Sequence, residues 1–235
     1  METPVFAEAV RHFWATRNRQ AQAQAQAGTR DQGARGAVTG GRQMDGFSET
    51  LRLLLTHVGV PPECIFAQRA VELPGFFRPT KQWDLLVVRD KELVAAVELK
   101  SQVGPSFGNN FNNRTEEAMG TALDVWTAYR EGAFSPSSPP WVGYLLLLED
   151  CPRSREPVGV SEPHFPVFSE FKAASYAKRY EVFCKKLVRE RHYSNACFLL
   201  ADRGRAEEPV NYEEPCPELC GAQFVRTLLA RAQLR

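Results

Sequence analysis

The sequence lacks long apolar runs and recognisable targeting segments. No stretch approaches the ~20 consecutive apolar residues that a membrane-spanning helix needs. The opening METPVFAEAVRHFW also lacks the charged-then-apolar order of a secretory signal peptide. These absences argue against an integral membrane protein and lead us to expect a cytoplasmic one. The rest of the composition, 43% hydrophobic and 24% charged, is that of an ordinary globular chain.

Residues that bind zinc are few and scattered. The six cysteines are spread along 235 residues, too large a chain for a disulfide-built miniature domain, so we expect them to be reduced. Only Cys216 and Cys220 are close together, and no second pair or neighbouring His completes a zinc set. The four histidines show no recognisable ligand spacing. The sequence therefore argues against a structural zinc site and against a histidine-based metal nuclease.

Net charge is also nearly absent. A value of +1 at pH 7 argues against indiscriminate binding of polyanions. The charges are unevenly distributed, however: residues 11–42 contain six arginines and one acid, and residues 172–191 contain seven basic residues and two acids. Both segments could face DNA, because neutralisation of phosphates drives most nucleic-acid affinity. For the second segment, a solvated helix face is an equally good interpretation.

The length favours a single domain, 1–235, with extensions around one core. We divide it into an N-terminal helix with a glycine- and arginine-rich, DNA-facing segment (1–46), a catalytic core (47–150), and C-terminal helices with one strand (151–235). The glycine-rich part is too flexible to pack without a partner, and a disordered linker is the alternative interpretation.

Apolar periodicity predicts the order of the elements. Thr3 and Pro4 mark the start of a first helix, and Asp45 or Ser48 caps a second that ends at Gly59. Further helices are predicted at 115–130, with two acids in its first turn, at 169–191 and at 217–234. Strands are predicted at 65–73, 83–89, 93–100, 141–148 and 196–201. The polar turn 89–92 joins the second and third strands as a hairpin, and the fourth strand is apolar enough to be central and buried.

Three charged residues accompany the second and third predicted strands. Glu98 and Lys100 follow Asp84 by fourteen and sixteen residues and stand in the apolar stretch LVAAVELKSQ. Because strand side chains alternate, Glu98 and Lys100 leave one face while Val97 and Leu99 leave the other. A divalent ion explains such a set, since hard cations bind carboxylate oxygens and an ammonium can orient the attacking water. Glu-x-Lys is nevertheless a common tripeptide, and an exposed pair of this kind is worth only about 0–1 kcal/mol.

The predicted order, a helix, three strands in a meander, a helix and a strand, resembles the common core of the PD-(D/E)xK nuclease superfamily. We therefore expect an α/β fold, a restriction-endonuclease-like core in which helices flank a central mixed β-sheet, with N- and C-terminal helical additions. The segments RPTKQWDLLVV, AAVELKSQVGPSFGNNFNNRTEEAMG and GGRQMDGF are moreover similar to the XhoI-type restriction endonucleases. That family comprises type II enzymes that cut the palindrome CTCGAG.

The resemblance implies specific roles for the charged residues. Asp84, Glu98 and Lys100 would be catalytic, Mg²⁺ the cofactor and double-stranded DNA the substrate, with 5′-phosphate ends as products. The metal ligands would be Asp84, Glu98 and the backbone carbonyl of Leu99. Pro79 lies five residues before Asp84 and is not adjacent to it, but the proline is dispensable in this superfamily. Glu49 on the second helix is a further catalytic candidate, for which an exposed helical glutamate is the alternative interpretation.

Candidate base-reading residues follow the catalytic strand. Amide side chains can pair with adenine and Arg with guanine. The predicted DNA-binding residues are Gln102, Asn109, Asn110, Asn112, Asn113 and Arg114, together with Arg35, Arg42 and Gln43 in the glycine-rich segment. Asparagines are also turn formers and helix caps, and Asn113 is a candidate cap for the third helix.

A palindromic target implies a homodimer, because each half-site must meet an identical surface. A cognate DNA methyltransferase is implied as a functional partner, without physical contact. Two alternatives remain open at this stage: a structure-selective repair or junction nuclease of the same fold, and a DNA-binding module that has lost catalysis.

Overall fold

The protein folds around a five-stranded mixed sheet. The computed structural model describes residues 4–26 and 42–233. The strand order is β1-β4-β5-β6-β7, in which β1, β4 and β5 are antiparallel neighbours and β5, β6 and β7 are parallel. A separate hairpin is formed by β2 and β3. The strands are β1 (Ile65–Phe66), β2 (Glu72–Pro74), β3 (Thr80–Gln82), β4 (Leu85–Arg89), β5 (Glu92–Gln102), β6 (Trp141–Glu149) and β7 (Asn195–Ala201).

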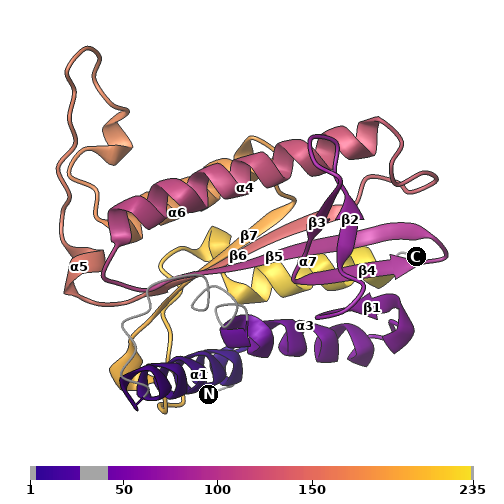
Figure 1. Cartoon of the computed structure of the whole chain (residues 1–235), viewed down its shortest axis with the longest axis horizontal. Coiled ribbons are helices and arrows are strands. Elements are labelled where there is room, and N and C mark those ends of the chain that lie inside the picture. The colour runs from indigo at the N-terminus through magenta and orange to yellow at the C-terminus, as the bar shows by residue number, and fades with distance from the viewer. Residues whose placement is uncertain (1–3, 27–41, 234–235) are drawn as a thin grey trace.

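Helices cover both faces of the sheet (Figure 1). One face packs against α4 (Phe107–Arg130) and α6 (Tyr176–Arg189), and the other against α1 (Ala7–Gln26), α3 (Asp45–His57) and α7 (Gly221–Gln233). The shorter helices are η1 (Arg42–Met44), η2 (Pro62–Cys64), α5 (Pro152–Arg155), η3 (Ser169–Phe171), η4 (Arg203–Arg205) and η5 (Pro217–Leu219). The expected α/β fold, a mixed sheet flanked by helices, is confirmed. Within the described residues, none of the helices combines the length and apolar content that a bilayer crossing requires.

The alternation of side chains along β5 places the charged residues on one face. Val97 and Leu99 belong to the core beneath α1, α3 and α7, whereas Ala96 belongs to the core beneath α4 and α6. Glu98 and Lys100 therefore leave toward the face that α4 and α6 cover. This alternation is the predicted one. The prediction for β6 is also confirmed, because all of its residues except the last are buried and it pairs with β5 and β7 on its two sides.

The turn between β4 and β5 agrees with the predicted hairpin. Asp90 and Lys91 both have positive φ, 51° and 66°. Positive φ at both central residues is typical of a type I′ turn, whose twist matches that of the antiparallel strands it joins.

The predicted strand at 65–73 is wrong. It divides into β1, at the edge of the main sheet, and β2, in the separate hairpin. Between them Gln68 and Ala70 adopt positive φ, 69° and 52°, a conformation that extended strands do not contain. The division frees β2 and β3 to form a hairpin of their own.

The predicted start of the third helix is also wrong. Helix α4 begins at Phe107 and not at residue 115, so the candidate base-reading residues at 109–114 form the first turns of the helix. Asn113 is consequently not a cap, and the acids expected in the first turn lie farther inside the helix. Tertiary contacts outweigh the turn-forming asparagines here, since Phe107 stacks on Tyr176 and Phe111 packs edge-on against Tyr180.

Three other helix starts differ from prediction. Helix α7 begins at Gly221 instead of residue 217, which lies in the short helix η5. Helix α3 follows directly on η1, with Met44 at the N-cap position and both Asp45 and Ser48 inside the helix. Helix α6 begins at Tyr176 instead of residue 169, because Ala173 has a positive φ of 53° and ends the preceding turn. The predicted cap at Thr3 lies outside the described residues.

Segments from the two ends of the chain meet on the face opposite α4. The Asn211 side chain donates a hydrogen bond to the carbonyl of Ala7 at 2.9 Å. The amide of Phe6 donates to the Tyr212 hydroxyl at 3.3 Å. Helix α7 lies beside α3 and contributes Phe224 and Leu228 to the same core. Closure of this face therefore requires both the beginning and the end of the folded chain.

Candidate active site

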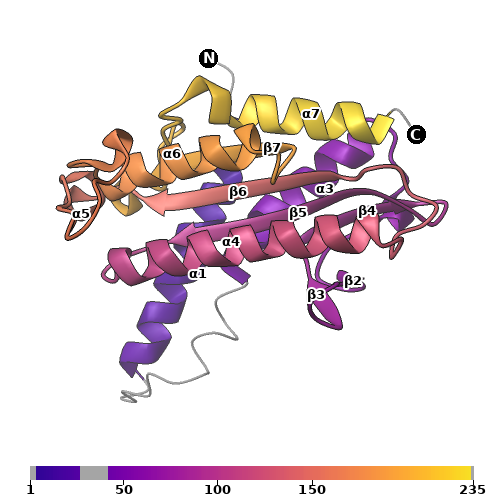
Figure 2. The same cartoon turned by 90° about the horizontal axis from the view of Figure 1, so that it is seen from above.

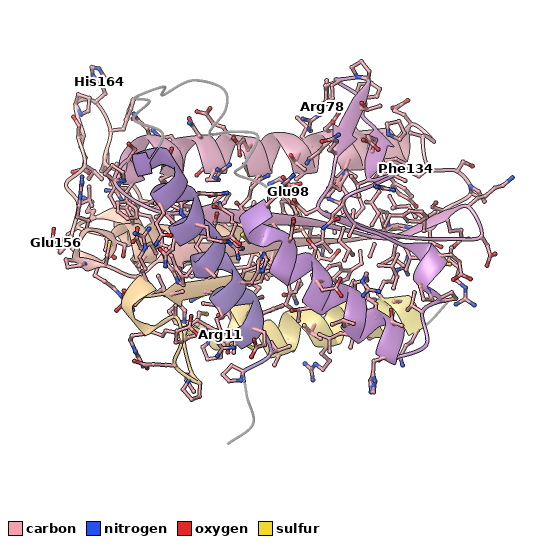
Figure 3. The ribbon with its side chains drawn as sticks, turned by 60° about the horizontal axis from the view of Figure 1, so that its bottom comes forward. Arg11, Arg78, Glu98, Phe134, Glu156 and His164 are labelled. Carbon is pink, nitrogen blue, oxygen red and sulfur yellow. The ribbon has the colours of Figure 1, made fainter. Side chains whose placement is uncertain are left out.

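The three charged residues singled out in the sequence converge where β4 begins. Asp84 directly precedes β4, and its Oδ2 accepts a hydrogen bond from the amide of Leu99 at 2.7 Å. Glu98 Oε1 forms an ion pair with Lys100 Nζ. Strand β5 continues past Lys100 to Gln102, whereas the predicted strand ended at residue 100, so Glu98 lies farther inside the strand than expected. In Figure 3, Glu98 lies between helix α1 and the hairpin that carries Arg78.

The end of the β4–β5 ladder explains why Asp84 binds Leu99. The last rungs join Leu85 to Val97 and the Asp84 amide to the Val97 carbonyl at 3.1 Å. One step farther along β5, no β4 residue remains to pair with Leu99, and the Asp84 carboxylate accepts its N–H instead. In a strand the N–H and C=O of one residue leave the same edge, so the Leu99 carbonyl also faces this side.

A fourth charged residue, which the sequence analysis did not select, completes the group. Lys81 on β3 donates to Glu98 Oε2 at 2.6 Å, and the two side chains are only 12% and 5% exposed. Lys81 Nζ also lies 4.7 Å from the centre of the Trp83 ring. Its strand alternates, with Thr80 and Gln82 exposed and Lys81 turned inward. That alternation was the available signal, but it could not identify Glu98 as the partner.

The two ammonium groups determine the charge state of Glu98. Burial opposes ionisation of this carboxyl, but Lys100 and Lys81 together hold the pKa of Glu98 below its ordinary range. Burial likewise opposes the Lys100 charge, yet Glu98 and Asp84 raise the pKa of Lys100. Glu98 is therefore ionised and Lys100 protonated at neutral pH.

Asp84 has the opposite perturbation. Burial, and then the negative charge of Glu98, raise the pKa of Asp84 from 3.8 to about 6. Lys100 and the Leu99 amide offset only part of this effect. Two neighbouring carboxyl groups with pKa values displaced in opposite directions are typical of functional sites.

The donor set suits a magnesium ion. The described residues contain no group of three or more His, Cys, Asp or Glu side chains placed to hold a metal. Mg²⁺, however, is usually bound by one or two carboxylates and completed by water and substrate phosphates. Asp84 and Glu98, with the Leu99 carbonyl on the same edge, provide such a set of hard oxygen donors. The residues present therefore fit the implied cofactor.

The hairpin that carries Lys81 is fixed to α4 by a buried carboxylate. Asp124 Oδ1 accepts hydrogen bonds from the amides of Phe76 and Phe77 at 2.8 and 2.9 Å, and Oδ2 accepts one from Arg78 Nε at 2.7 Å. Gly75 permits this approach, since a Cβ there would lie 2.7 Å from both Asp124 Oδ2 and the Arg78 carbonyl. Figure 2 shows this hairpin and α1 projecting from the same side of the molecule.

The predicted base-reading residues near β5 occupy α4. Asn109, Asn112 and Asn113 are exposed, whereas Asn110 and Arg114 are partly buried and share one stripe of the helix. Arg114 lies close enough to the site for its positive charge to lower the pKa of Lys100, against the larger opposite effect of the two carboxylates. Gln102 is buried, and its amide donates to the Val103 carbonyl at 3.0 Å.

The remaining predicted residues show no bond to Asp84, Glu98 or Lys100 within the described part of the chain. Gln43 is buried, accepts a hydrogen bond from Arg17 at 3.0 Å and donates one to Ser101 at 2.8 Å, so both ends of its amide are engaged within the protein. Arg42 is exposed beside α1, and Arg35 lies outside the described residues. Glu49 forms an ion pair with Arg52 at 2.6 Å and is 52% exposed.

The basic segment at 172–191 is largely neutralised by acids. Lys178 and Lys185 both pair with Glu181, and Lys186 pairs with Glu170. Arg189 pairs with an acid outside the segment, on η5. This arrangement favours a solvated helix face over a DNA-facing surface for α6.

Comparison with known proteins agrees with this geometry. The profile of a family described as "Restriction endonuclease XhoI" matches residues 23–212. The chain is 55% identical over 209 residues to the type II restriction enzyme BstVI of Geobacillus stearothermophilus, covering 87% of this chain and 93% of that enzyme. It is 56% identical over 158 residues to the type II restriction enzyme XhoI of Xanthomonas vasicola, covering 66% of this chain and 64% of that enzyme. A third relative, the type II restriction enzyme AbrI of Azospirillum brasilense, is 53% identical over 159 residues, or 67% of this chain and 71% of that enzyme. No solved structure matches.

Proposed function

Because this chain belongs to the XhoI family of type II restriction endonucleases, we propose that it cuts double-stranded DNA at CTCGAG in a magnesium-dependent reaction that leaves 5′-phosphate ends. The observation that carries the proposal is the convergence of Asp84, Glu98 and Lys100 at one edge of β5. We place the enzyme in the cytoplasm, with a cognate DNA methyltransferase that protects the same sequence in the host.

The two carboxylates and one carbonyl provide the metal-binding part of the site. Asp84, Glu98 and the Leu99 carbonyl would hold Mg²⁺, which when bound polarises the scissile phosphate and activates a water molecule. Asp84 must lose its proton to take part. Since burial and Glu98 raise the pKa of Asp84 to about 6, this requirement is met at neutral pH and above.

Lys100 lies beside the Glu98 carboxylate and supplies a positive charge to the site. Its ammonium pairs with Glu98 Oε1, and its side chain is 25% exposed. A positive charge there can hold the attacking water by a hydrogen bond and stabilise the negative charge that develops on the phosphate. Because Glu98 and Asp84 raise the pKa of Lys100, it stays protonated and serves as an electrostatic group.

The first turns of α4 are the proposed base-reading element. Asn110 and Arg114 share the stripe nearest the catalytic strand, and Asn109, Asn112 and Asn113 are exposed beside them. Arg114 supplies the guanidinium that suits guanine, and asparagine the amide that suits adenine. Arg42, and Arg35 in the segment outside the described residues, would add contacts to phosphates or bases.

Plasmid cleavage by variants in which one charged side chain is replaced by alanine tests the catalytic assignment. We expect Asp84→Ala and Lys100→Ala to lose at least ~100-fold in cleavage rate in Mg²⁺, because each removes a group that acts on the reacting phosphate. Binding of a CTCGAG duplex should persist in both variants. Lys172→Ala on the far basic segment is the control and should cut normally. Near-normal cleavage by either active-site variant would overturn the assignment.

The wild-type products test the specificity. Discrete fragments with ends mapping to CTCGAG and carrying 5′-phosphates are expected from a plasmid of known sequence. A smear, or cutting restricted to branched DNA, would instead indicate a structure-selective nuclease of the same fold.

A further inference from the structure

The Glu98 carboxylate is engaged on both oxygens by ammonium groups from two different elements. Lys100, on the same strand, pairs with Oε1, and Lys81, on β3, donates to Oε2 at 2.6 Å. With Asp84 nearby, the site holds two acids and two bases. When all four are ionised, their charges cancel.

This balance opposes metal binding in the absence of DNA. A divalent cation placed between Asp84 and Glu98 adds two positive charges to a largely buried group that already holds two ammoniums. In addition, Lys81 occupies Glu98 Oε2, one of the oxygens that a metal would use. A DNA phosphate brings the negative charge that offsets the cation. Metal and phosphate therefore favour each other's entry at this site.

Lys81 is better placed than Lys100 to change partner. Lys100 and Glu98 belong to the same strand, β5, so they stay side by side. Lys81 instead belongs to the separate β2–β3 hairpin, and its side chain extends from there to the Glu98 carboxylate. That hairpin is held to α4 by Asp124, so the backbone of β3 need not move. A lysine head on a flexible four-carbon stem can turn from the carboxylate to an oxygen of a phosphate bound next to it.

We propose that Lys81 is a fourth active-site residue, which exchanges its ion pair with Glu98 for one with a DNA phosphate when metal and DNA bind. The inference rests on the proposed function, because it takes Glu98 to be a metal ligand. Lys81 thereby couples the two binding events: it competes with the metal when DNA is absent and contacts the substrate when DNA is present.

Lys81→Met tests both halves of this exchange, because methionine keeps the length of the side chain and removes its charge. Binding to a CTCGAG duplex is measured by fluorescence anisotropy in Ca²⁺ over a series of salt concentrations. We expect binding to weaken by about tenfold at low salt and the logarithmic salt slope to fall by about one, as for the loss of one phosphate contact. Calorimetric titration of the DNA-free protein with Mn²⁺ should show roughly tenfold tighter binding, since a competing cation within about 4 Å has been removed.

Two companion variants separate charge from structure. Lys81→Arg keeps the positive charge and should restore most of the salt slope. Lys91→Met, on the exposed turn between β4 and β5, removes a lysine outside the site and should behave as wild type in both assays. Thermal melting of each variant verifies folding before the assays are compared.

Two results would overturn the exchange. An unchanged salt slope in Lys81→Met would make Lys81 a counter-ion of Glu98 alone. Weaker Mn²⁺ binding in the DNA-free variant would mean that Lys81 orients Glu98 for the metal instead of competing with it. Failure of the proposed function would give different results from failure of the exchange. The wild-type enzyme itself would then show no Mg²⁺-dependent cutting, and Glu98→Gln would bind Mn²⁺ as tightly as wild type does.

Discussion

Asp84 illustrates, at the scale of a single residue, how a proposed catalytic group can weaken the fold that carries it. Burial, and then Glu98, raise its pKa from 3.8 to about 6, so the folded protein holds this proton more tightly than the unfolded chain does. Stability is therefore lost as pH rises through this interval. Above pH 6 the ionised carboxylate costs about 2–3 kcal/mol.

We therefore predict that Asp84→Asn stabilises the metal-free protein at pH 8 by about 2 kcal/mol, because asparagine can still accept the Leu99 hydrogen bond without the charge. The gain should shrink as the pH falls below 6 and disappear below about pH 3, where Asp84 is protonated in both states. Urea unfolding in EDTA at the two pH values measures the difference. Glu116→Gln, an exposed acid on α4, serves as the control, and a destabilised Asp84→Asn at pH 8 would contradict the argument.

The residues of the site that lie on neighbouring strands could be predicted from the sequence. Asp84, Glu98 and Lys100 could be placed together because strand alternation and one hairpin fix their relative positions. Lys81 could not be placed, because its bond to Glu98 depends on how a separate hairpin packs against the sheet. Gln43 was selected for its donor and acceptor groups, but the sequence does not reveal that Arg17 and Ser101 engage both of them.

At the scale of elements, the β2–β3 hairpin depends on one carboxylate. We predict that Asp124→Ala destabilises the protein by about 1–3 kcal/mol, because the Phe76 and Phe77 amides lose their acceptor and Arg78 its ion pair. Hydrogen exchange at these amides should accelerate before global unfolding does. Glu131→Ala, just past the end of the same helix, is the control; equal exchange rates in wild type and Asp124→Ala would show that the hairpin is held by other contacts.

The extended start of α4 shows where element prediction failed. A glycine and four asparagines at 108–113 favour a turn by intrinsic preference, so we expected the helix to begin only at residue 115. The structure forms a helix there because Phe107 and Phe111 pack onto aromatic side chains of α6. Those partners lie more than sixty residues later in the chain, beyond the reach of any local pattern.

At the scale of the whole molecule, the proposed palindromic target calls for a two-fold symmetric enzyme. We predict that two chains bind one duplex containing a single CTCGAG, because each chain presents one set of base-reading residues to one half-site. Sedimentation velocity on the Ca²⁺ complex measures the stoichiometry. A duplex with one half-site replaced should lose most of its affinity, and a stable complex of one chain per intact site would contradict the homodimer.

The joining of the chain's two end regions also bears on biosynthesis. One face of the five-stranded sheet is covered by α1, which precedes all of its strands in the sequence, and by α7, which is synthesised only after all of them. A nascent chain on the ribosome holds Asp84, Glu98 and Lys100 long before the residues that close this face emerge. DNA-cutting ability should therefore arise only after α7 has been synthesised and has packed on this face, so that a shorter nascent chain should be unable to cut the DNA of its own cell.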